Sequence, residues 1–355
     1  MKRVLILGCT GSIGKSSIDI VQNMPEDFTV CGLQAHSNKD ELLKLSKEFN
    51  CPTLLSSEDN SEEAFNKLIE ESKPDIVING IAGAAGLLPS KVVLENKIDL
   101  ALANKETIVM AGPLIKKLAK ENNVKLIPVD SEHSAIFNLV ENFGSKNISK
   151  IVITASGGPF REYSAEQLKN VTVEQALKHP TWNMGTKITI DSSTLANKGL
   201  EVIEAAYLFD VTHEQIEVVV HPQSLIHSLV RTKDGMLYAQ ISDPDMKHPI
   251  FGALCWPNYK DTYLKPFDLF DHTMTFYKPR YKDFPMLNYA FDCVKEKKSY
   301  TIAYNAANEI AVDAFINKKI SFTQIFDVVK FVLDKDWSQE ILSFEQVFEQ
   351  DKLAR

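Results

Sequence analysis

A run of charged and polar side chains, from Asp191 to Glu201, has residue types and spacing suited to chemistry on a charged substrate. Asn197 and Lys198 lie four and three residues before Glu201, so in a helix the three side chains share one face. The preceding apolar alternation, residues 188–190, predicts a strand, and residues 191–194 are types that favour a helix N-cap. The predicted helix therefore starts among residues 191–194.

A helix that starts there would offer free backbone N–H groups and the positive end of its dipole to an anion. Ser192, Asn197 and Lys198 would surround that anion, and a phosphate group fits such a seat. The alternative interpretation is a well-capped amphipathic helix with a surface Lys–Glu pair, and this stretch alone leaves both open.

Two carboxylates follow the predicted strand 125–129. Asp130 and Glu132 are two residues apart, so both point to one side if the chain is extended there. Paired carboxylates are ligands suited to Mg²⁺ or Mn²⁺. Helix capping by Asp130 or Ser131 is an equally good interpretation. A third carboxylate would favour a metal site, and Glu201 is the candidate.

The glycine-rich stretch Gly8–Gly14 follows a predicted strand at 3–8 and reads GxxGxxG. Such a turn lets the backbone approach a dinucleotide pyrophosphate at a helix N-terminus. The alternative is a turn that only packs. After the second predicted strand, Ser37, Asn38 and Lys39 stand where an NAD-specific enzyme usually carries an acidic residue. Since a carboxylate would repel a 2′-phosphate, the cofactor is predicted to be NADPH; a simple polar turn is the alternative.

Further loops carry polar or small residues at the ends of predicted strands. Asn104, Lys105 and Glu106 follow strand 98–102, at the sheet edge where ligands of doubly wound folds bind. Ser156 and two glycines follow strand 151–155 and could bind an anion. Residues 179–185 combine Trp182 and Met184 with Pro and Gly, which fits either core packing or a lid over the substrate.

Composition sets the wider class of the protein. The chain has 355 residues, 44% hydrophobic and 24% charged, which indicates two or three globular domains. A net charge of −8 argues against a nucleic-acid partner, and no apolar run is long enough to span a membrane. The N-terminal apolar run is too short for a signal peptide. Five scattered cysteines without CxxC spacing indicate reduced thiols, so the cytoplasm is the expected location.

The elements that must position these residues fall into three regions. Strands are predicted at 3–8, 28–34, 52–56, 75–79, 98–102 and 125–129, with helices at 40–48, 61–71 and 105–121. This alternation predicts an α/β fold with a doubly wound, Rossmann-like parallel sheet. Strands at 151–155 and 226–231 belong to an expected α+β catalytic domain. Helices at 286–297, 302–317, 322–334 and 343–354 predict a small C-terminal helical domain.

Taken together, the motifs resemble 1-deoxy-D-xylulose 5-phosphate reductoisomerase, a family of the methylerythritol phosphate route to isoprenoids. The resemblance covers nearly the whole chain in order. It is carried by residues 8–14, 83–89, 103–106, 129–133, 156–160, 179–185, 191–201, 221–228, 256–258 and 305–309.

The resemblance implies an organisation and a reaction. The expected parts are an NADPH-binding Rossmann-like domain (1–129), a catalytic and metal-binding domain (130–257), a connecting segment (258–285) and a C-terminal helical domain (286–355), in a homodimer. The implied reaction isomerises and reduces 1-deoxy-D-xylulose 5-phosphate to 2-C-methyl-D-erythritol 4-phosphate with NADPH. The metal would be Mg²⁺ or Mn²⁺, with Co²⁺ as a further candidate.

The resemblance also implies roles for individual residues. The metal ligands would be Asp130, Glu132 and Glu201, which with Lys105 form the catalytic set. The substrate would contact Ser131, Glu132, Ser156, His179, Trp182, Met184, Ser192, Asn197, Lys198 and Glu201. The cofactor would contact Thr10, Gly11, Ser12, Ile13, Ser37, Asn38, Asn104, Glu106 and Gly185. Many relatives carry Gly-Lys-Asn where this chain has His36-Ser37-Asn38, so the usual lysine near the 2′-phosphate is absent.

Other functions use some of the same parts. A metal-dependent NAD(P) hydroxy-acid dehydrogenase would also pair carboxylates with a nicotinamide, but it would need no phosphate seat. A semialdehyde dehydrogenase would need a mid-chain cysteine nucleophile, and no cysteine lies between Cys51 and Cys255. A dinucleotide sensor would account for the first 129 residues but not for three carboxylates with a phosphate seat.

Overall fold

The computed structural model describes residues 1–182 and 184–355. Asn183, inside the predicted lid, lies outside the described residues. The chain forms two compact units. Unit 1 comprises residues 1–107, 115–134 and 245–266, and unit 2 comprises residues 108–114, 135–244 and 267–355. The predicted division into four parts stays a prediction.

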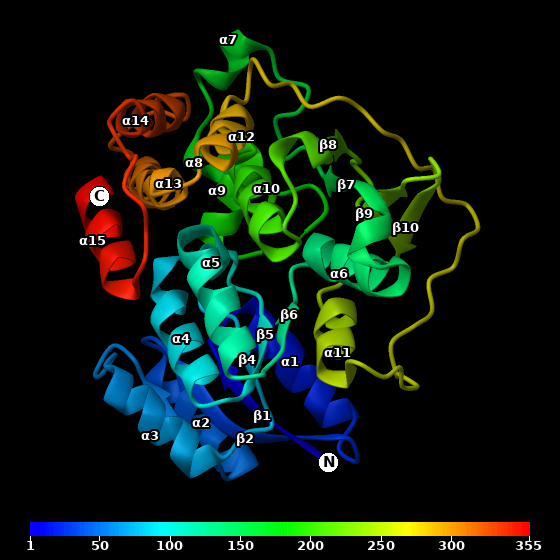
Figure 1. The fold of residues 1–355 in the computed structure, drawn as a ribbon, viewed down its shortest axis with the longest axis vertical. Coiled ribbons are helices and arrows are strands. Elements are labelled where there is room, and N and C mark those ends of the chain that lie inside the picture. Colours follow the sequence, from blue (N-terminus) through cyan, green and yellow to red (C-terminus); the bar gives the residue numbers. More distant parts are fainter. Residues whose placement is uncertain (183) are drawn as a thin grey trace. The chain divides into compact units, whose positions relative to one another are not determined.

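Unit 1 is built on a six-stranded parallel sheet of order β3-β2-β1-β4-β5-β6. Figure 1 labels β1, β2, β4, β5 and β6. Its strands are β1 (Lys2–Leu7), β2 (Phe28–Ala35), β3 (Thr53–Leu55), β4 (Ile76–Asn79), β5 (Asp99–Leu102) and β6 (Leu126–Pro128). The six strands and the doubly wound order predicted from the sequence are confirmed. The strands were recognisable because parallel strands covered on both faces read as short apolar runs.

The helices of unit 1 cover both faces of this sheet. They are α1 (Ser12–Asn23), α2 (Lys39–Phe49), α3 (Glu62–Ser72), α4 (Leu87–Glu95) and α11 (Lys247–Cys255), with both ends of α5 (Lys105–Glu121). Helix α1 packs on α11, and α3 packs on α4 (Figure 1). Helix α11 was not predicted; its Phe251 ring meets Phe28 edge-on at 6.4 Å, which fastens this late segment to the first half of the sheet.

Unit 2 contains a mixed four-stranded sheet of order β10-β9-β7-β8. Its strands are β7 (Ile148–Ala155), β8 (Ile216–Val220), β9 (Ile226–Thr232) and β10 (Leu237–Ile241). Strand β7 pairs parallel with β8 and antiparallel with β9, as an α+β domain allows. Strands β8 and β10 were missed by sequence reasoning. All five residues of β10 are exposed or half-buried, and polar and apolar types do not alternate clearly along the strand.

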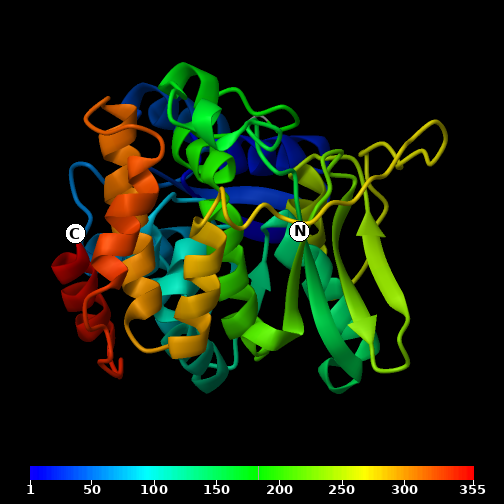
Figure 2. The same ribbon diagram turned by 90° about the horizontal axis from the view of Figure 1, so that it is seen from above.

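The helices of unit 2 contribute to one large apolar core and to a smaller cluster around Trp337. They are α7 (Ala165–Leu168), α8 (Val173–Ala176), α9 (Thr186–Thr194), α10 (Ala196–Leu208), α12 (Met286–Glu296), α13 (Tyr300–Ile316), α14 (Gln324–Leu333) and α15 (Phe344–Ala354), with most of α6 (Ser131–Phe143). The four predicted C-terminal helices are confirmed, and Figure 2 shows them in orange and red. Ile153 of β7, Leu200 of α10 and Tyr304 of α13 are all fully buried in the same core.

Two local predictions were wrong. Residues 188–190 are not a strand, because they lie inside α9, which packs on α10 and α13. The helix that carries Asn197 does not start among residues 191–194 either. It starts at Ala196, after Leu195 turns the chain in a left-handed conformation (φ 60°). Burial of Ile190 against the core overrides the weak β preference of three alternating residues.

The paired carboxylates after β6 are also arranged differently from the extended geometry considered above. Helix α6 begins at Ser131, and the Asp130 carbonyl accepts a hydrogen bond from the Ser134 N–H at 2.8 Å. Glu132 therefore lies in the first turn of a helix. Among the described residues, no helix combines the length and the apolar character needed to cross a membrane.

We expect Gly14→Ala to destabilise the protein, because an added Cβ would lie 2.4 Å from the Cys9 Cα and from the Gly8 carbonyl oxygen. The free energy of unfolding should fall by about 1–3 kcal/mol, as for an overpacked site. The matched control is Gly252→Ala in α11, where a Cβ meets nothing within 4 Å. It should raise stability by up to about 1 kcal/mol. Denaturant unfolding measures both, and equal effects would contradict the steric argument.

Candidate active site

The predicted cofactor residues of unit 1 follow the carboxyl ends of β1, β2 and β5, in loops and in the first turns of the helices that follow. Gly8 has a positive φ (78°), and its N–H donates to the Gln34 side chain at 2.8 Å. Gly11 is the N-cap of α1 and makes no side-chain cap, and the first turn carries no acidic residue. The start of α1, with Thr10, Gly11, Ser12 and Ile13 around it, is therefore suited to a pyrophosphate.

The loops after β1 and β4 touch each other, and Asn104 holds the second of them. A Cβ on Gly80 would lie 2.9 Å from the Ile13 side chain. The buried Asn104 amide donates to the carbonyls of Ile81 (2.7 Å) and Gly83 (2.9 Å). It also donates to the Glu106 carboxylate at 3.0 Å. The structure thus brings six predicted cofactor residues together: Thr10, Gly11, Ser12, Ile13, Asn104 and Glu106.

The residues predicted near the cofactor 2′-phosphate follow β2 and are exposed. Asn38 caps α2, and its side chain accepts from the Glu41 N–H at 3.2 Å. Lys39 forms an exposed ion pair with Glu58, at 2.8 Å. Ser37 stands at the start of this turn. A helix start with a nearby cation is compatible with binding of a phosphate. Asp40 and Glu41 in the first turn of α2 make the same place less favourable for an anion.

The metal-ligand candidates of unit 1 lie beside a buried lysine. The Lys105 ammonium, on the first residue of α5, forms an ion pair with Asp130. Their side chains are 6% and 10% exposed. Burial opposes ionisation of Asp130, yet the charges of Lys105 and His133 hold the pKa of this carboxyl well below its usual value. The Ser131 hydroxyl donates to Glu132 at 2.7 Å. Unit 1 therefore presents a pre-ionised carboxylate, which is the form that binds a metal.

The predicted phosphate residues of unit 2 come from three elements. Ser156 follows β7, and its hydroxyl lies 3.0 Å from His179 Nε2. The backbone at Gly158 (φ 67°) lies so close to α9 that a Cβ would be 2.7 Å from the Ser192 carbonyl oxygen. The loop after β7 and the end of α9 are therefore in direct contact, and a glycine is needed between them.

The hydrogen bonds around His179 define its tautomer. Its Nδ1 accepts from the N–H groups of Thr181 (3.1 Å) and Trp182 (2.9 Å). The ring proton consequently lies on Nε2, which donates to the Ser156 hydroxyl. Burial lowers the pKa of His179 to about 4. A neutral imidazole N–H and a hydroxyl are donors that suit a phosphate oxygen.

Helix α10 presents the predicted amide, ammonium and carboxylate together. Asn197 Nδ2 donates to Glu201 Oε1 at 2.6 Å, and Lys198 Nζ donates to Glu201 Oε2 at 2.5 Å. Lys198 is 4% exposed and Glu201 is 1% exposed, so the pair is held away from solvent. The predicted shared face of Asn197, Lys198 and Glu201 is confirmed, although the helix begins later than expected.

The described lid residues of unit 2, 179–182 and 184–185, lie between α8 and α9 and belong to no helix or strand. The Trp182 ring packs edge-on against His227 of β9, with 6.1 Å between ring centroids. Met184 is half-buried. Gly185 is exposed and is the N-cap of α9. The lid therefore ends where α9 begins.

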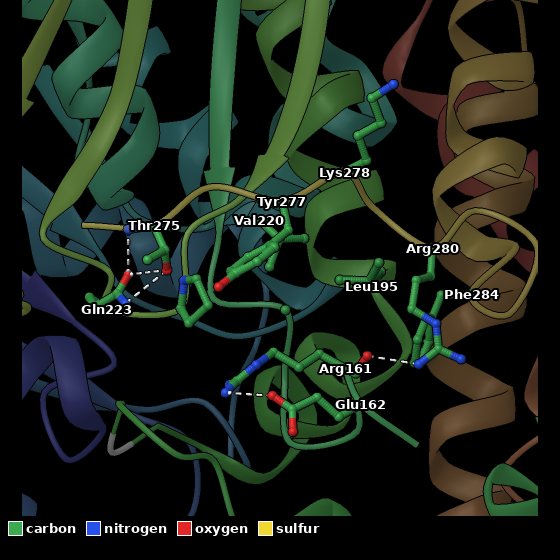
Figure 3. A pocket seen from close by; sticks show the side chains of 12 residues that line it. Arg161, Glu162, Leu195, Val220, Gln223, Thr275, Tyr277, Lys278, Arg280 and Phe284 are labelled. Atoms are coloured by element: carbon green, nitrogen blue, oxygen red, sulfur yellow. Dashed lines mark hydrogen bonds and ion pairs between the residues drawn. The ribbon is translucent and has the colours of Figure 1, made fainter. Parts of the chain in front are cut away.

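A pocket of about 370 Å³ opens beside this region of unit 2 (Figure 3). Gly157 and Leu195 line it, so it adjoins the loop after β7 and the joint between α9 and α10. Arg161 faces Glu162 at 3.3 Å, and Arg280 donates to the Arg161 carbonyl at 2.7 Å, as the dashed lines in Figure 3 show. Sequence reasoning missed both arginines, since neither stands in a motif.

The chain is similar to known proteins along its whole length. Residues 4–63 and 56–112 match the family described as 1-deoxy-D-xylulose 5-phosphate reductoisomerase. Residues 126–209 and 241–355 match two C-terminal domains described for the same enzyme. A curated relative of that name from Treponema denticola is 49% identical, over 100% of this chain and 95% of the relative. One from Chlorobaculum tepidum is 47% identical, over 100% and 98%.

Solved structures agree with these matches. A reductoisomerase in complex with NADPH, fosmidomycin and magnesium superposes with a TM-score of 0.91 at 36% identity, over 100% of this chain and 97% of that one. The Zymomonas mobilis enzyme in complex with NADPH gives 0.90 at 37% identity, with the same coverage. The expected fold class is confirmed.

We expect His179 to titrate with a midpoint near 4 instead of its ordinary 6.5, because burial disfavours the imidazolium. The unfolded chain takes up the proton first as the pH falls. This site therefore contributes stability that is present above pH 6.5 and is lost between pH 6.5 and about 4. An NMR titration, with the resonance assigned by His179→Gln, measures the midpoint. A midpoint near 6.5 would show that the ring is solvated.

Proposed function

The chain belongs to the 1-deoxy-D-xylulose 5-phosphate reductoisomerase family, and we propose that it catalyses that reaction with NADPH and a divalent metal ion. The product is 2-C-methyl-D-erythritol 4-phosphate, an isoprenoid precursor. The observation that carries this proposal is the 49% identity to a reductoisomerase over the full length of the chain. The side chains described above support the proposal, since each has the chemistry that its expected role requires.

We propose that Asp130 and Glu132 of unit 1 and Glu201 of unit 2 hold the metal ion. Three carboxylates form a hard donor set that suits Mg²⁺ or Mn²⁺. The low pKa of Asp130 supports this assignment, because its carboxylate needs no deprotonation before it binds a cation. A divalent ion bound there would supply Lewis-acid polarisation of substrate oxygens.

The residues of the chain would orient the substrate and control protons around that ion. Lys105 balances the excess negative charge of the carboxylates and holds Asp130 in place. Ser131 would contact the substrate backbone through the hydroxyl that now donates to Glu132. Three carboxylates carry more charge than one divalent ion, so a lysine partner lowers the cost of bringing them together.

Unit 2 would bind the phosphate end of the substrate. Ser156, neutral His179 and Ser192 offer donors to the phosphate oxygens, and the start of α10 with Asn197 and Lys198 adds N–H groups and charge. Binding energy from this remote group can be used to close Trp182 and Met184 over the substrate and exclude water.

Unit 1 would bind NADPH. The N-terminus of α1 would take the pyrophosphate, and Asn104 with Glu106 would line the loop edge beside it. Ser37 and Asn38 would lie near the 2′-phosphate. Gly185 of unit 2 is proposed as a further cofactor contact, because it is exposed at the end of the lid.

We further propose a homodimer that acts in the cytoplasm. Phe276 and Tyr277, next to the edge strand β8, are 46% and 56% exposed. Large exposed aromatic side chains are typical of surfaces that bind another protein. Light scattering would show the mass of one chain if this assembly does not form.

The experiment that tests the function is NADPH oxidation by the purified protein with 1-deoxy-D-xylulose 5-phosphate and Mg²⁺. Consumption should stop with a chelator and should be slower with NADH. Folded protein that is inactive here but oxidises a simple 2-hydroxy acid with NADP⁺ would favour the hydroxy-acid dehydrogenase.

We expect Glu201→Gln to lower kcat by about 100-fold or more, since one metal-binding charge is lost. The amide oxygen can still accept from Asn197, so the circular dichroism spectrum should stay unchanged, but the buried Lys198 loses its anionic partner and the melting temperature should fall. Glu214→Gln on the exposed surface is the matched control. A Mg²⁺ titration of the rate distinguishes weaker metal binding from a defect in folding. Wild-type turnover at saturating Mg²⁺ would remove Glu201 from the metal site.

A further inference from the structure

A buried carboxylate of α9, Asp191, connects the helix before the candidate phosphate site to the C-terminal helix α13. Asp191 is 1% exposed. Its Oδ2 accepts from Lys187 Nζ at 2.7 Å, within the same helix. Its Oδ1 accepts from Asn308 Nδ2 of α13 at 2.7 Å, across 117 residues of sequence. Each oxygen of the carboxylate therefore has one strong donor.

The hydrogen bond between Asn308 and Asp191 restricts how α9 can pack on α13. A buried carboxylate is stable only when its oxygens are hydrogen-bonded, so α9 is held at the position where Asn308 reaches Asp191. Asn308 is itself fully buried. The two helices pack against each other, and Figure 1 labels them side by side with α10.

The predicted phosphate residues depend on the end of α9. Ser192 follows Asp191 directly, and its carbonyl faces Gly158 in the loop that carries Ser156. The Thr194 hydroxyl lies 3.1 Å from the Asp191 carbonyl and accepts from the Ala196 N–H at 3.2 Å. Ala196 is the first residue of α10, which carries Asn197 and Lys198. A shift of Asp191 would consequently move the donors on both sides of the phosphate.

The same contact anchors the end of the lid. Lys187, the second partner of Asp191, lies two residues after Gly185. The Thr189 hydroxyl donates to the Gly185 carbonyl at 2.8 Å. The first turn of α9 is thus tied to Asp191 and, through it, to α13, and the lid ends at Gly185, just before that turn.

We propose that Asn308 is a positioning residue for the phosphate seat, acting through Asp191. Helix α13 would then set substrate affinity without touching the substrate. The proposal rests on the proposed function, because it takes Ser156, His179, Ser192, Asn197 and Lys198 as the phosphate ligands.

The test begins with Asn308→Leu, which keeps the side-chain size and removes the donor to Asp191. We expect kcat/KM for 1-deoxy-D-xylulose 5-phosphate to fall by about 10-fold or more, mostly through KM. The KM for NADPH should change less than about twofold, since the cofactor contacts of unit 1 are unchanged. Inorganic phosphate should raise the melting temperature of the wild type but not that of the variant.

The matched control is Asn305→Leu, the same substitution one turn away on α13. Asn305 is also fully buried, but its amide donates to Glu309 at 3.3 Å, whereas Asp191 accepts from Asn308. It should lower stability while leaving KM for the substrate and the response to phosphate within about threefold of wild type.

The double variant Asp191→Asn with Asn308→Asp exchanges the donor and the acceptor of the contact. The amide introduced at position 191 would donate to the carboxylate introduced at position 308 and accept from Lys187, so both hydrogen bonds remain while the negative charge moves from α9 to α13. We expect this swap to restore kcat/KM to within about fivefold of wild type.

Equal kinetic defects in the two leucine variants would overturn the proposal, since they would reflect lost stability alone. A folded swap variant as defective as Asn308→Leu would also overturn it. A wild type inactive on 1-deoxy-D-xylulose 5-phosphate would instead count against the proposed function, and the phosphate-induced melting shift would still test the role of Asn308.

Discussion

The requirement that buried charges be paired governs the arrangement of polar residues in both units. Among the described residues, two lysine–carboxylate pairs are nearly removed from solvent: Lys105 with Asp130 and Lys198 with Glu201. In a third pair, Asp191 is buried while its partner Lys187 stays 23% exposed. Burial of an unpaired charge would cost several kcal/mol, so each pair restricts where its helix or loop can lie. The side chains that the chemistry needs are therefore held in place before any ligand arrives.

Hydrogen bonds, charge pairs and burial also set the protonation states of Asp130 and His179 before a ligand binds. Asp130 stays ionised because the Lys105 ammonium lies beside it, although burial alone would raise its pKa. His179 stays neutral because burial lowers its pKa and its Nδ1 accepts two backbone N–H groups. The surroundings of Asp130 thus keep it in the anionic form that binds a cation, and those of His179 keep it as a neutral N–H donor that can bind an anion.

The fold of unit 1 was predictable because its strands are short, apolar and separated by helices with clear periodicity. The predicted site residues on its loops follow from that topology, since the carboxyl ends of parallel strands share one edge. The stretch 188–194 was not predictable. Ile188 and Ile190 alternate as in a strand, yet α9 forms because Ile190 and Asp191 find partners in a core assembled from residues more than 100 positions away.

The sequence by itself determined the parallel sheet, the C-terminal helices and the chemical types of the site residues, because local apolar patterning and helical spacing encode them. Asn197, Lys198 and Glu201 meet because they are three and four residues apart on one helix. Only the tertiary structure decided that Asn308 meets Asp191 and that Gly158 lies against Ser192. Such contacts join distant segments, and they depend on how complete helices pack, which no local pattern specifies.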